Sequence, residues 1–144
     1  MGTPIATVKL GGICQAFPDL CDTIVPLVGK VPVPYTNTAQ LKDAELTSES
    51  DNVKATGDWI VVIDRADPTS SFIAESTGNE PAIEGIISGV TKGQCNFLSG
   101  SSTVLAGGKK VVRMFDPTGQ NADDQTANCT GVVLGGVPNI LVGD

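Results

Sequence analysis

Residues 92–121 constrain the fold of this chain most, because tight turns divide this stretch into three short strand-like segments. Gly107 and Gly108 lie between two of these segments. A two-residue hairpin loop needs positive φ at both central positions, and glycine adopts positive φ without steric cost. The pattern therefore predicts a β-hairpin closed by the two glycines, with Val104 and Val111 in the core.

The composition supports a fold of many short strands. Seventeen glycines and nine prolines in 144 residues imply frequent chain reversals, and only 4% of the residues are aromatic. The core must therefore be built from Val, Ile, Leu and Ala, which favours short strands over long helices. We predict a single all-β domain over residues 1–144, with at most one or two short helices.

Several segments predict extended structure. The clearest buried strand is 59–63, which is apolar and bounded by Gly and Asp residues. Further strands are predicted at 5–13 and, as a pair, at 131–142. Residues 31–35 contain alternate prolines, which cannot donate to a sheet ladder, so this segment is predicted to be extended or to lie at a sheet edge. Pro18 predicts a turn at 17–19.

The remaining segments predict a helix and two polar surface regions. Residues 79–89 are the best helix candidate, because Asn79 can cap the start and three isoleucines share one face. Residues 38–58 predict an exposed strand pair or a surface loop whose carboxylates are solvated. Residues 116–128 predict a polar loop.

The charge and the lack of histidine exclude several functions. Nine basic residues against 16 acidic ones give a net charge of −7, so no basic surface for nucleic acid is expected. No segment predicts stable membrane anchoring. Without histidine, the chain cannot build a Ser-His-Asp or Cys-His catalytic site. Asp64 and Asp67 are interpreted as turn residues with local hydrogen bonds. We therefore predict no catalytic residues, no enzyme activity and no cofactor.

The four cysteines, Cys14, Cys21, Cys95 and Cys129, lie far apart in the sequence. Zinc ribbons instead use closely spaced pairs of cysteines. The favoured interpretation is therefore four reduced, buried thiols and no metal. A metal site made of these cysteines and a disulfide formed after export are the two alternatives.

Short motifs occur in a particular order along most of the chain. They are an early Gly-Gly, Phe17-Pro18-Asp19-Leu20-Cys21, Pro32-Val33-Pro34-Tyr35-Thr36-Asn37, residues 85–89, Lys92-Gly93, Ser101-Ser102, Gly108-Lys109 and residues 111–117. Their order and spacing resemble those of the PAAR-like proteins. That resemblance implies a compact, cone-shaped β-structure that caps and sharpens the trimeric β-helical (VgrG-type) spike of a bacterial contractile injection system.

The resemblance also implies partners and a location. One copy would bind each spike trimer, and effector cargo could dock on the tip. The protein would assemble in the bacterial cytoplasm, form the distal tip of a type VI or extracellular injection apparatus, and help puncture the target membrane on firing. PAAR proteins proper hold a metal near the apex with histidines and a cysteine, and this site cannot be carried over without histidine. An effector carrier of the same family and a free β-rich binding module are the alternative functions.

Overall fold

The regular structure of this protein is almost entirely β. The computed structural model describes residues 2–9 and 12–143. Its strands are β1 (Thr3–Ile5), β2 (Ile13–Val25), β3 (Gly29–Gln40), β4 (Glu49–Ala55), β5 (Asp58–Ile63), β6 (Phe72–Ile73), β7 (Glu84–Gly85), β8 (Gln94–Phe97), β9 (Leu105–Ala106), β10 (Lys109–Val111), β11 (Pro117–Ala122), β12 (Cys129–Leu134) and β13 (Val137–Val142). Three single-turn 3-10 helices cover Leu41–Asp43, Leu46–Ser48 and Pro68–Ser70. The predicted all-β class is confirmed.

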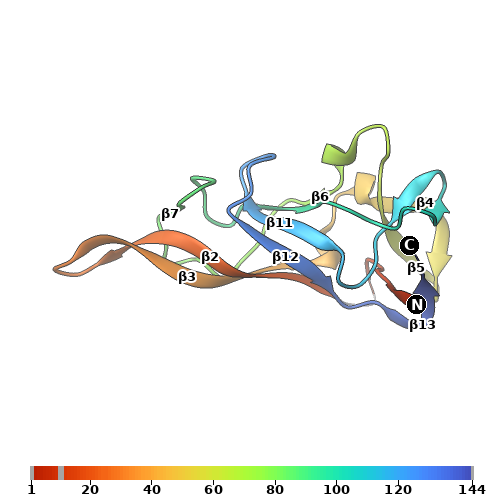
Figure 1. Cartoon of the computed structure of the whole chain (residues 1–144), viewed down its shortest axis with the longest axis horizontal. Helices are drawn as coiled ribbons and strands as arrows, with labels where there is room; N and C mark the ends of the chain where they lie inside the picture. The colour runs from red at the N-terminus through yellow and green to blue at the C-terminus, as the bar shows by residue number, and fades with distance from the viewer. Residues whose placement is uncertain (1, 10–11, 144) are drawn as a thin grey trace.

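One long hairpin gives the molecule its shape. Strands β2 and β3 pair antiparallel over most of their length, from Ile13↔Gln40 to Val25↔Gly29. They form one side of a seven-stranded sheet with the order β3-β2-β12-β11-β8-β6, and β7 pairs with β2. Figure 1 shows the hairpin extending past the other elements as a narrow end, whereas both chain ends and β4, β5 and β13 lie at the wide end.

Three segments distant in sequence meet at the wide end in a closed ring of backbone hydrogen bonds. The N–H of Ala6 donates to the carbonyl of Val112 over 3.0 Å, the N–H of Val112 donates to Val61, and the N–H of Val61 donates to Ala6. Each pair of segments is antiparallel near the ring, as the bridges Ile5↔Arg113 and Thr7↔Ile60 and the β5–β10 pairing record. Three mutually antiparallel segments cannot lie in one flat sheet. They must be arranged around an axis.

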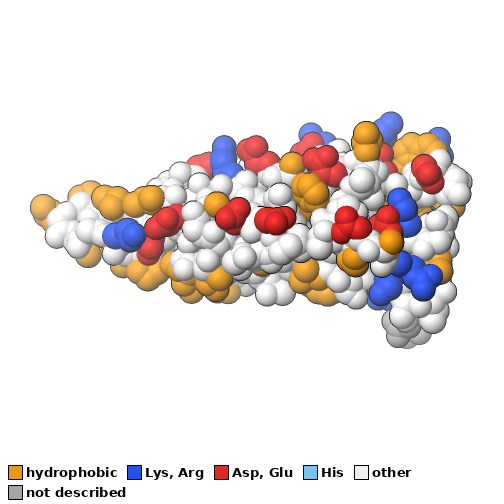
Figure 2. All heavy atoms as spheres, turned by 90° about the horizontal axis from the view of Figure 1, so that it is seen from above, with side chains coloured by type: hydrophobic (Ala, Val, Ile, Leu, Met, Phe, Trp, Pro, Cys, Tyr) orange, Lys and Arg blue, Asp and Glu red, His pale blue; other side chains and the backbone are white. Residues whose placement is uncertain are grey.

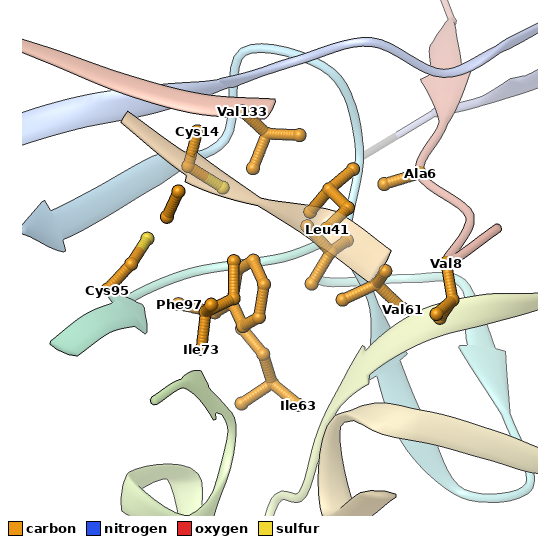
Figure 3. Packing of buried hydrophobic residues seen from close by; sticks show 12 residues of the cluster. Ala6, Val8, Cys14, Leu41, Val61, Ile63, Ile73, Cys95, Phe97 and Val133 are labelled. Carbon is orange, nitrogen blue, oxygen red and sulfur yellow. The ribbon is translucent and has the colours of Figure 1, made fainter. Parts of the chain in front are cut away.

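This ring separates two apolar clusters, because side chains alternate across a strand. Ala6, Val61 and Val112 contribute to a cluster that extends toward the seven-stranded sheet (Figure 3). Their chain neighbours, such as Ile5 and Val62, contribute to a second cluster with residues of β13. The members of the first cluster are Ala6, Val8, Cys14, Ala39, Leu41, Val61, Ile63, Ile73, Cys95, Phe97, Val112 and Val133. Aliphatic side chains thus dominate the core, as the composition predicts.

Several predicted elements are confirmed. The strand at 59–63 is β5, and the pair at 131–142 corresponds to β12 and β13. Residues 31–35 lie in β3, which is an edge strand of its sheet, as expected for alternate prolines. Gly107 and Gly108 join β9 to β10 with φ of 57° and 81°, the predicted tight turn.

Of the short helix or helical turn predicted at 79–89, only a single turn forms, in which the N–H of Gly89 donates to the carbonyl of Gly85. The segment otherwise forms turns and the two-residue strand β7. Its backbone donors bind other elements, since the N–H of Ile83 donates to Asp22 and that of Ile86 donates to Leu20, both on β2. A side chain at Gly85 would also lie 2.5 Å from Asn128 Oδ1. Packing against β2 therefore overrides the local helical pattern.

The turn predicted at 17–19 is wrong, because β2 continues through it. The register skips from Ala16↔Asn37 to Asp19↔Tyr35, which makes this site a bulge. A residue in a bulge is left out of the ladder, so Pro18 is tolerated there without a backbone donor.

Two further expectations need correction, and two others are partly answered. The predicted polar loop at 116–128 contains β11, whose side chains are mostly buried. Val111 is buried as predicted, but Val104 is 38% exposed and lies outside the core.

The strand predicted at 5–13 falls partly on residues that the structure does not describe. Its described part includes the last residue of β1 and the first residue of β2. Residues 38–58 combine the end of β3, two 3-10 turns, β4 and the start of β5.

We expect Gly108→Val to lower the free energy of unfolding by at least about 1 kcal/mol, because a β-branched residue is strained at positive φ. Gly108→Asn is the matched control, since nothing lies within 4 Å of a Cβ at this position and Asn tolerates positive φ better. Urea unfolding of both variants measures the difference. Equal midpoints for the Val and Asn variants would contradict the turn assignment.

Candidate functional site

A buried carboxylate lies where the long hairpin meets the rest of the sheet. On β2, Cys14 and Ala16 face inward before the bulge, and Asp19 and Cys21 face inward after it. The inward positions thus change from even to odd numbers, because a bulge adds one residue to a strand with a two-residue period. Asp19 becomes fully buried, with 0% of its surface exposed.

Three asparagine amides surround this carboxylate. The Nδ2 atom of Asn79 donates to Asp19 Oδ2 over 2.7 Å. Those of Asn121 and Asn128 donate to Asp19 Oδ1 over 3.3 and 2.5 Å. The same three nitrogens lie 3.7–3.9 Å from the sulfur of Cys21. The site therefore draws together β2, β11, the residue before β12 and the loop before β7.

The backbone fixes the orientation of each amide. The Oδ1 atom of Asn79 accepts from the N–H of Lys92, and that of Asn121 accepts from the N–H of Gly93. Asn128 Oδ1 accepts from two consecutive N–H groups, those of Ile87 and Ser88. Because backbone N–H groups can only donate, the amide oxygens must face them and the NH₂ groups must face Asp19.

A second buried network, centred on Gln120, lies on the neighbouring position of β11. Its Nε2 atom donates to Asn37 Oδ1 over 2.8 Å and to the carbonyls of Asn37 and Cys14. Its Oε1 atom accepts from the hydroxyl of Thr118. Asn37 in turn donates to Ser76 Oγ. These bonds connect β11 to β2 and β3 through side chains, and they explain how a polar strand can be buried.

Asp19 is held by dipoles and not by an opposite charge. No basic side chain pairs with it in residues 2–9 and 12–143. Burying an ionised carboxylate is very unfavourable unless hydrogen bonds compensate, and bonds to a charged acceptor are roughly twice as strong as neutral ones. The three amides supply that compensation. Each of them also binds the backbone of residues 87–93, so the charge organises this loop.

The four cysteines fall into two pairs. Cys14 and Cys95 lie in the apolar cluster (Figure 3), where the hydrogen bond with Cys14 and burial raise the pKa of Cys95 well above its usual range. Burial and the negative charge of Asp19 raise the pKa of Cys21 to about 12. The same two causes raise the pKa of Cys129. All four are free thiols and buried.

This arrangement does not suit a metal ion. Around Asp19, the three amides present N–H donors, whereas a cation needs oxygen, nitrogen or sulfur lone pairs. The raised pKa of Cys21 and Cys129 keeps them protonated, and the thiolate is the form that binds metals. Among the described residues, no group of three or more Cys, Asp or Glu side chains could hold a metal ion. The sequence prediction that the protein binds no metal remains a prediction.

The other candidate residues lie on the surface. Asp64 accepts a hydrogen bond from the N–H of Ala66, and Asp67 accepts one from the hydroxyl of Thr69, so both have the predicted local turn bonds. A surface cavity of about 300 Å³ lies beside Asp64 and does not include the Asp19 site. It is lined by Ile63, Asp64, Arg65, Pro68, Leu98, Ser99 and Lys110. No helix in the described residues is long and apolar enough to cross a membrane.

Comparison with protein families agrees with the fold. The family model described as "Toxin PAAR-like domain" matches residues 12–130 of this chain. The chain therefore belongs to the PAAR-like family of spike-tip-related proteins of contractile injection systems. This is a structural family and not a known family of enzymes. Searches of curated proteins and of solved structures find no match.

Asp19→Asn should lower the free energy of unfolding by on the order of 3 kcal/mol. The substitution removes the negative charge and places a fourth NH₂ donor beside the three asparagine NH₂ groups, which then lack an acceptor. Asp51→Asn, an exposed carboxylate on β4, is the matched control and should change stability by less than about 0.5 kcal/mol. Urea unfolding at neutral pH measures both. Equal small losses for the two variants would show that the carboxylate does not organise the site.

The raised thiol pKa values predict a loss of stability at alkaline pH. Thiols of the unfolded chain titrate near 9.0, whereas Cys21 titrates near 12 when folded. The unfolded chain therefore releases protons that the folded chain retains. Stability should be full below pH 9 and fall above it, by at most about 1.4 kcal/mol per pH unit and thiol.

Unfolding free energies measured from pH 8 to pH 10 test this dependence. The double variant Cys21→Ala/Cys129→Ala should show a smaller loss over the same range, even though it is less stable at pH 8. An identical pH slope in the two proteins would contradict the assignment of the titration to these thiols.

Proposed function

We propose that this protein caps the trimeric β-helical spike of a contractile injection system, with one copy on each trimer. The observation that supports this proposal most is the ring formed by Ala6, Val61 and Val112. Within one chain, three antiparallel segments surround an axis. A trimer also presents three equivalent chains around an axis. A cap built in this way can offer a similar contact to each of the three spike chains.

The wide end also carries strands that have a strand neighbour on one side only. Among the described residues, β4 and β9 are the edges of their four-stranded sheet, and β13 pairs on one side only, with β1. Apolar side chains are exposed here, including Leu105 on β9 and Leu141 on β13. Exposed edges and apolar groups favour association with other strands, and a solenoid needs a capping unit at its end. The wide end is thus the proposed docking face.

The narrow end then points away from the spike. This polarity would place the β2–β3 hairpin foremost on firing, in agreement with a role in membrane puncture. The protein would assemble with the spike in the bacterial cytoplasm and leave with it. Effector cargo is a second partner in this proposal, and the surface cavity lined by Arg65 and Lys110 is one place for it to bind.

Native mass spectrometry of the protein mixed with the spike trimer of its own system tests the stoichiometry. We expect one copy of this chain per three spike chains. Three copies per trimer would contradict the proposal.

Single substitutions test the docking face. Leu141→Glu and Leu105→Glu should weaken binding to the spike at least tenfold, because each places a charge in an apolar contact. Ile87→Glu, an exposed residue of the flanking loop, is the control and should bind as the natural chain does. Equal affinities for all three variants would show that the wide end is not the contact.

A further inference from the structure

The end of the β2–β3 hairpin exposes large apolar side chains. Ile24 is 60% exposed, Val28 is 72% exposed and Leu27, at the turn, is fully exposed at 109%. Figure 2 shows hydrophobic side chains at the narrow end of the molecule. Large apolar groups gathered on an exposed surface mark an interaction site more often than single ones do. Nothing in the core requires these residues, because they lie beyond the rest of the sheet (Figure 1).

Charged groups begin only behind this tip. Residues 23–29 carry no charge. Lys30 then pairs with Asp22 over 3.7 Å and with Glu84 over 3.3 Å. These three residues form an ionic cluster of both signs where β7 pairs with the hairpin, here called the collar. Beside the collar, the hydroxyls of Tyr35 and Thr23 are hydrogen-bonded over 2.7 Å. Ile24 is the register partner of Lys30, so only residues 25–29 lie beyond the charges, and Leu27 and Val28 are the large apolar side chains at the very end.

This order matches the layers of a lipid bilayer surface. The apolar tip can lie in the hydrocarbon layer. Zwitterionic headgroups carry both a phosphate and an ammonium group, which can pair with the positive and negative charges of the collar. Tyrosine is common at the boundary between these layers, because its ring is apolar and its hydroxyl is polar.

The backbone of the tip permits only a shallow insertion. The strand ladder continues to Val25↔Gly29, and the N–H of Val28 donates to the carbonyl of Val25 over 3.1 Å. Beyond Asp22, β2 pairs only with β3 among the described residues, so the outer edges of this two-stranded ribbon need water or headgroups nearby. From the level of Lys30 to Leu27 is three residues, or about 10 Å of strand. The tip therefore reaches only the outer hydrocarbon layer, a depth comparable to that of interfacial helices.

We propose that Leu27 and Val28 insert into one leaflet of a lipid bilayer, with Ile24 at the hydrocarbon boundary and the Asp22–Lys30–Glu84 collar at the headgroups. The proposal rests on the proposed function, which places this hairpin foremost, and it adds a specific lipid contact. A convex, uncharged tip fits a fluid hydrocarbon layer, whereas a protein partner would need a preformed pocket. Attraction to anionic lipid is not expected, because the chain carries a net charge of −7.

Fluorescence of a labelled tip tests the insertion. Val28→Cys is labelled with an environment-sensitive dye under native conditions, in which the four buried natural cysteines are protected. Vesicles of phosphatidylcholine and phosphatidylethanolamine are then added to millimolar lipid. We expect a blue shift, a several-fold rise in intensity, and quenching by lipids that carry a shallow spin label. Leu141→Cys with the same dye, at the wide end, should show none of these changes.

A second substitution shows whether the tip residues, and not the attached dye, cause the binding to vesicles. Leu27→Asp in the Val28→Cys background should abolish the spectral change, whereas Leu27→Met should retain it, because Met is apolar and is not β-branched at this positive φ. Three results would overturn the proposal: unchanged spectra with vesicles, a change that requires anionic lipid, or a change without lipid as protein concentration rises. The last result would identify a second copy of the chain as the occupant.

Spike binding is measured on the same variants. Leu27→Asp should still bind the spike trimer, because the substitution is far from the wide end. Loss of vesicle insertion with intact spike binding therefore concerns the tip alone. Conversely, a natural chain that inserts into vesicles and does not bind the spike would refute the proposed function and leave the lipid contact standing.

Discussion

The buried charge of Asp19 is the interaction on which the shape of this protein depends. Its oxygens accept from asparagines of β11, of the segment before β12 and of the loop before β7. The hairpin that extends beyond the sheet is thus fixed at its root by hydrogen bonds to three other segments. A projecting two-stranded ribbon is marginally stable by itself. Anchoring at this root is what allows the hairpin to be long.

The two ends of the molecule are built by different physical means. Around Asp19 and Gln120, polar side chains fill the interior and are joined to one another by hydrogen bonds. Around the ring of Ala6, Val61 and Val112, aliphatic side chains pack in two clusters on opposite sides. Hydrogen bonds are directional and packing is not, so the first region sets the position of the hairpin and the second forms a compact base.

The sequence predicted what depends on local geometry. Gly107-Gly108 allowed positive φ, alternate prolines at 32 and 34 required an edge, and the apolar run at 59–63 required a buried strand. It did not predict the Asp19 site, because a polar residue is normally expected at the surface. The segment around Asn121 was therefore interpreted as a loop, although its amides are buried. The bulge at Pro18 was a further obstacle, since it reverses which residues of β2 face inward. The motif Phe17-Pro18-Asp19-Leu20-Cys21, noted for the family resemblance, was the available signal.

A single charge also accounts for the chemistry of the surrounding groups. The carboxylate of Asp19 orients three amides by attraction, and it adds to burial in raising the pKa of Cys21 and Cys129. The thiols remain protonated as a result, and the amide oxygens remain turned away toward the backbone. Both effects remove lone pairs from the interior that a cation would need. In this chain, an anion surrounded by neutral donors holds the root of the hairpin, and the chemistry of the site follows from that sign of charge.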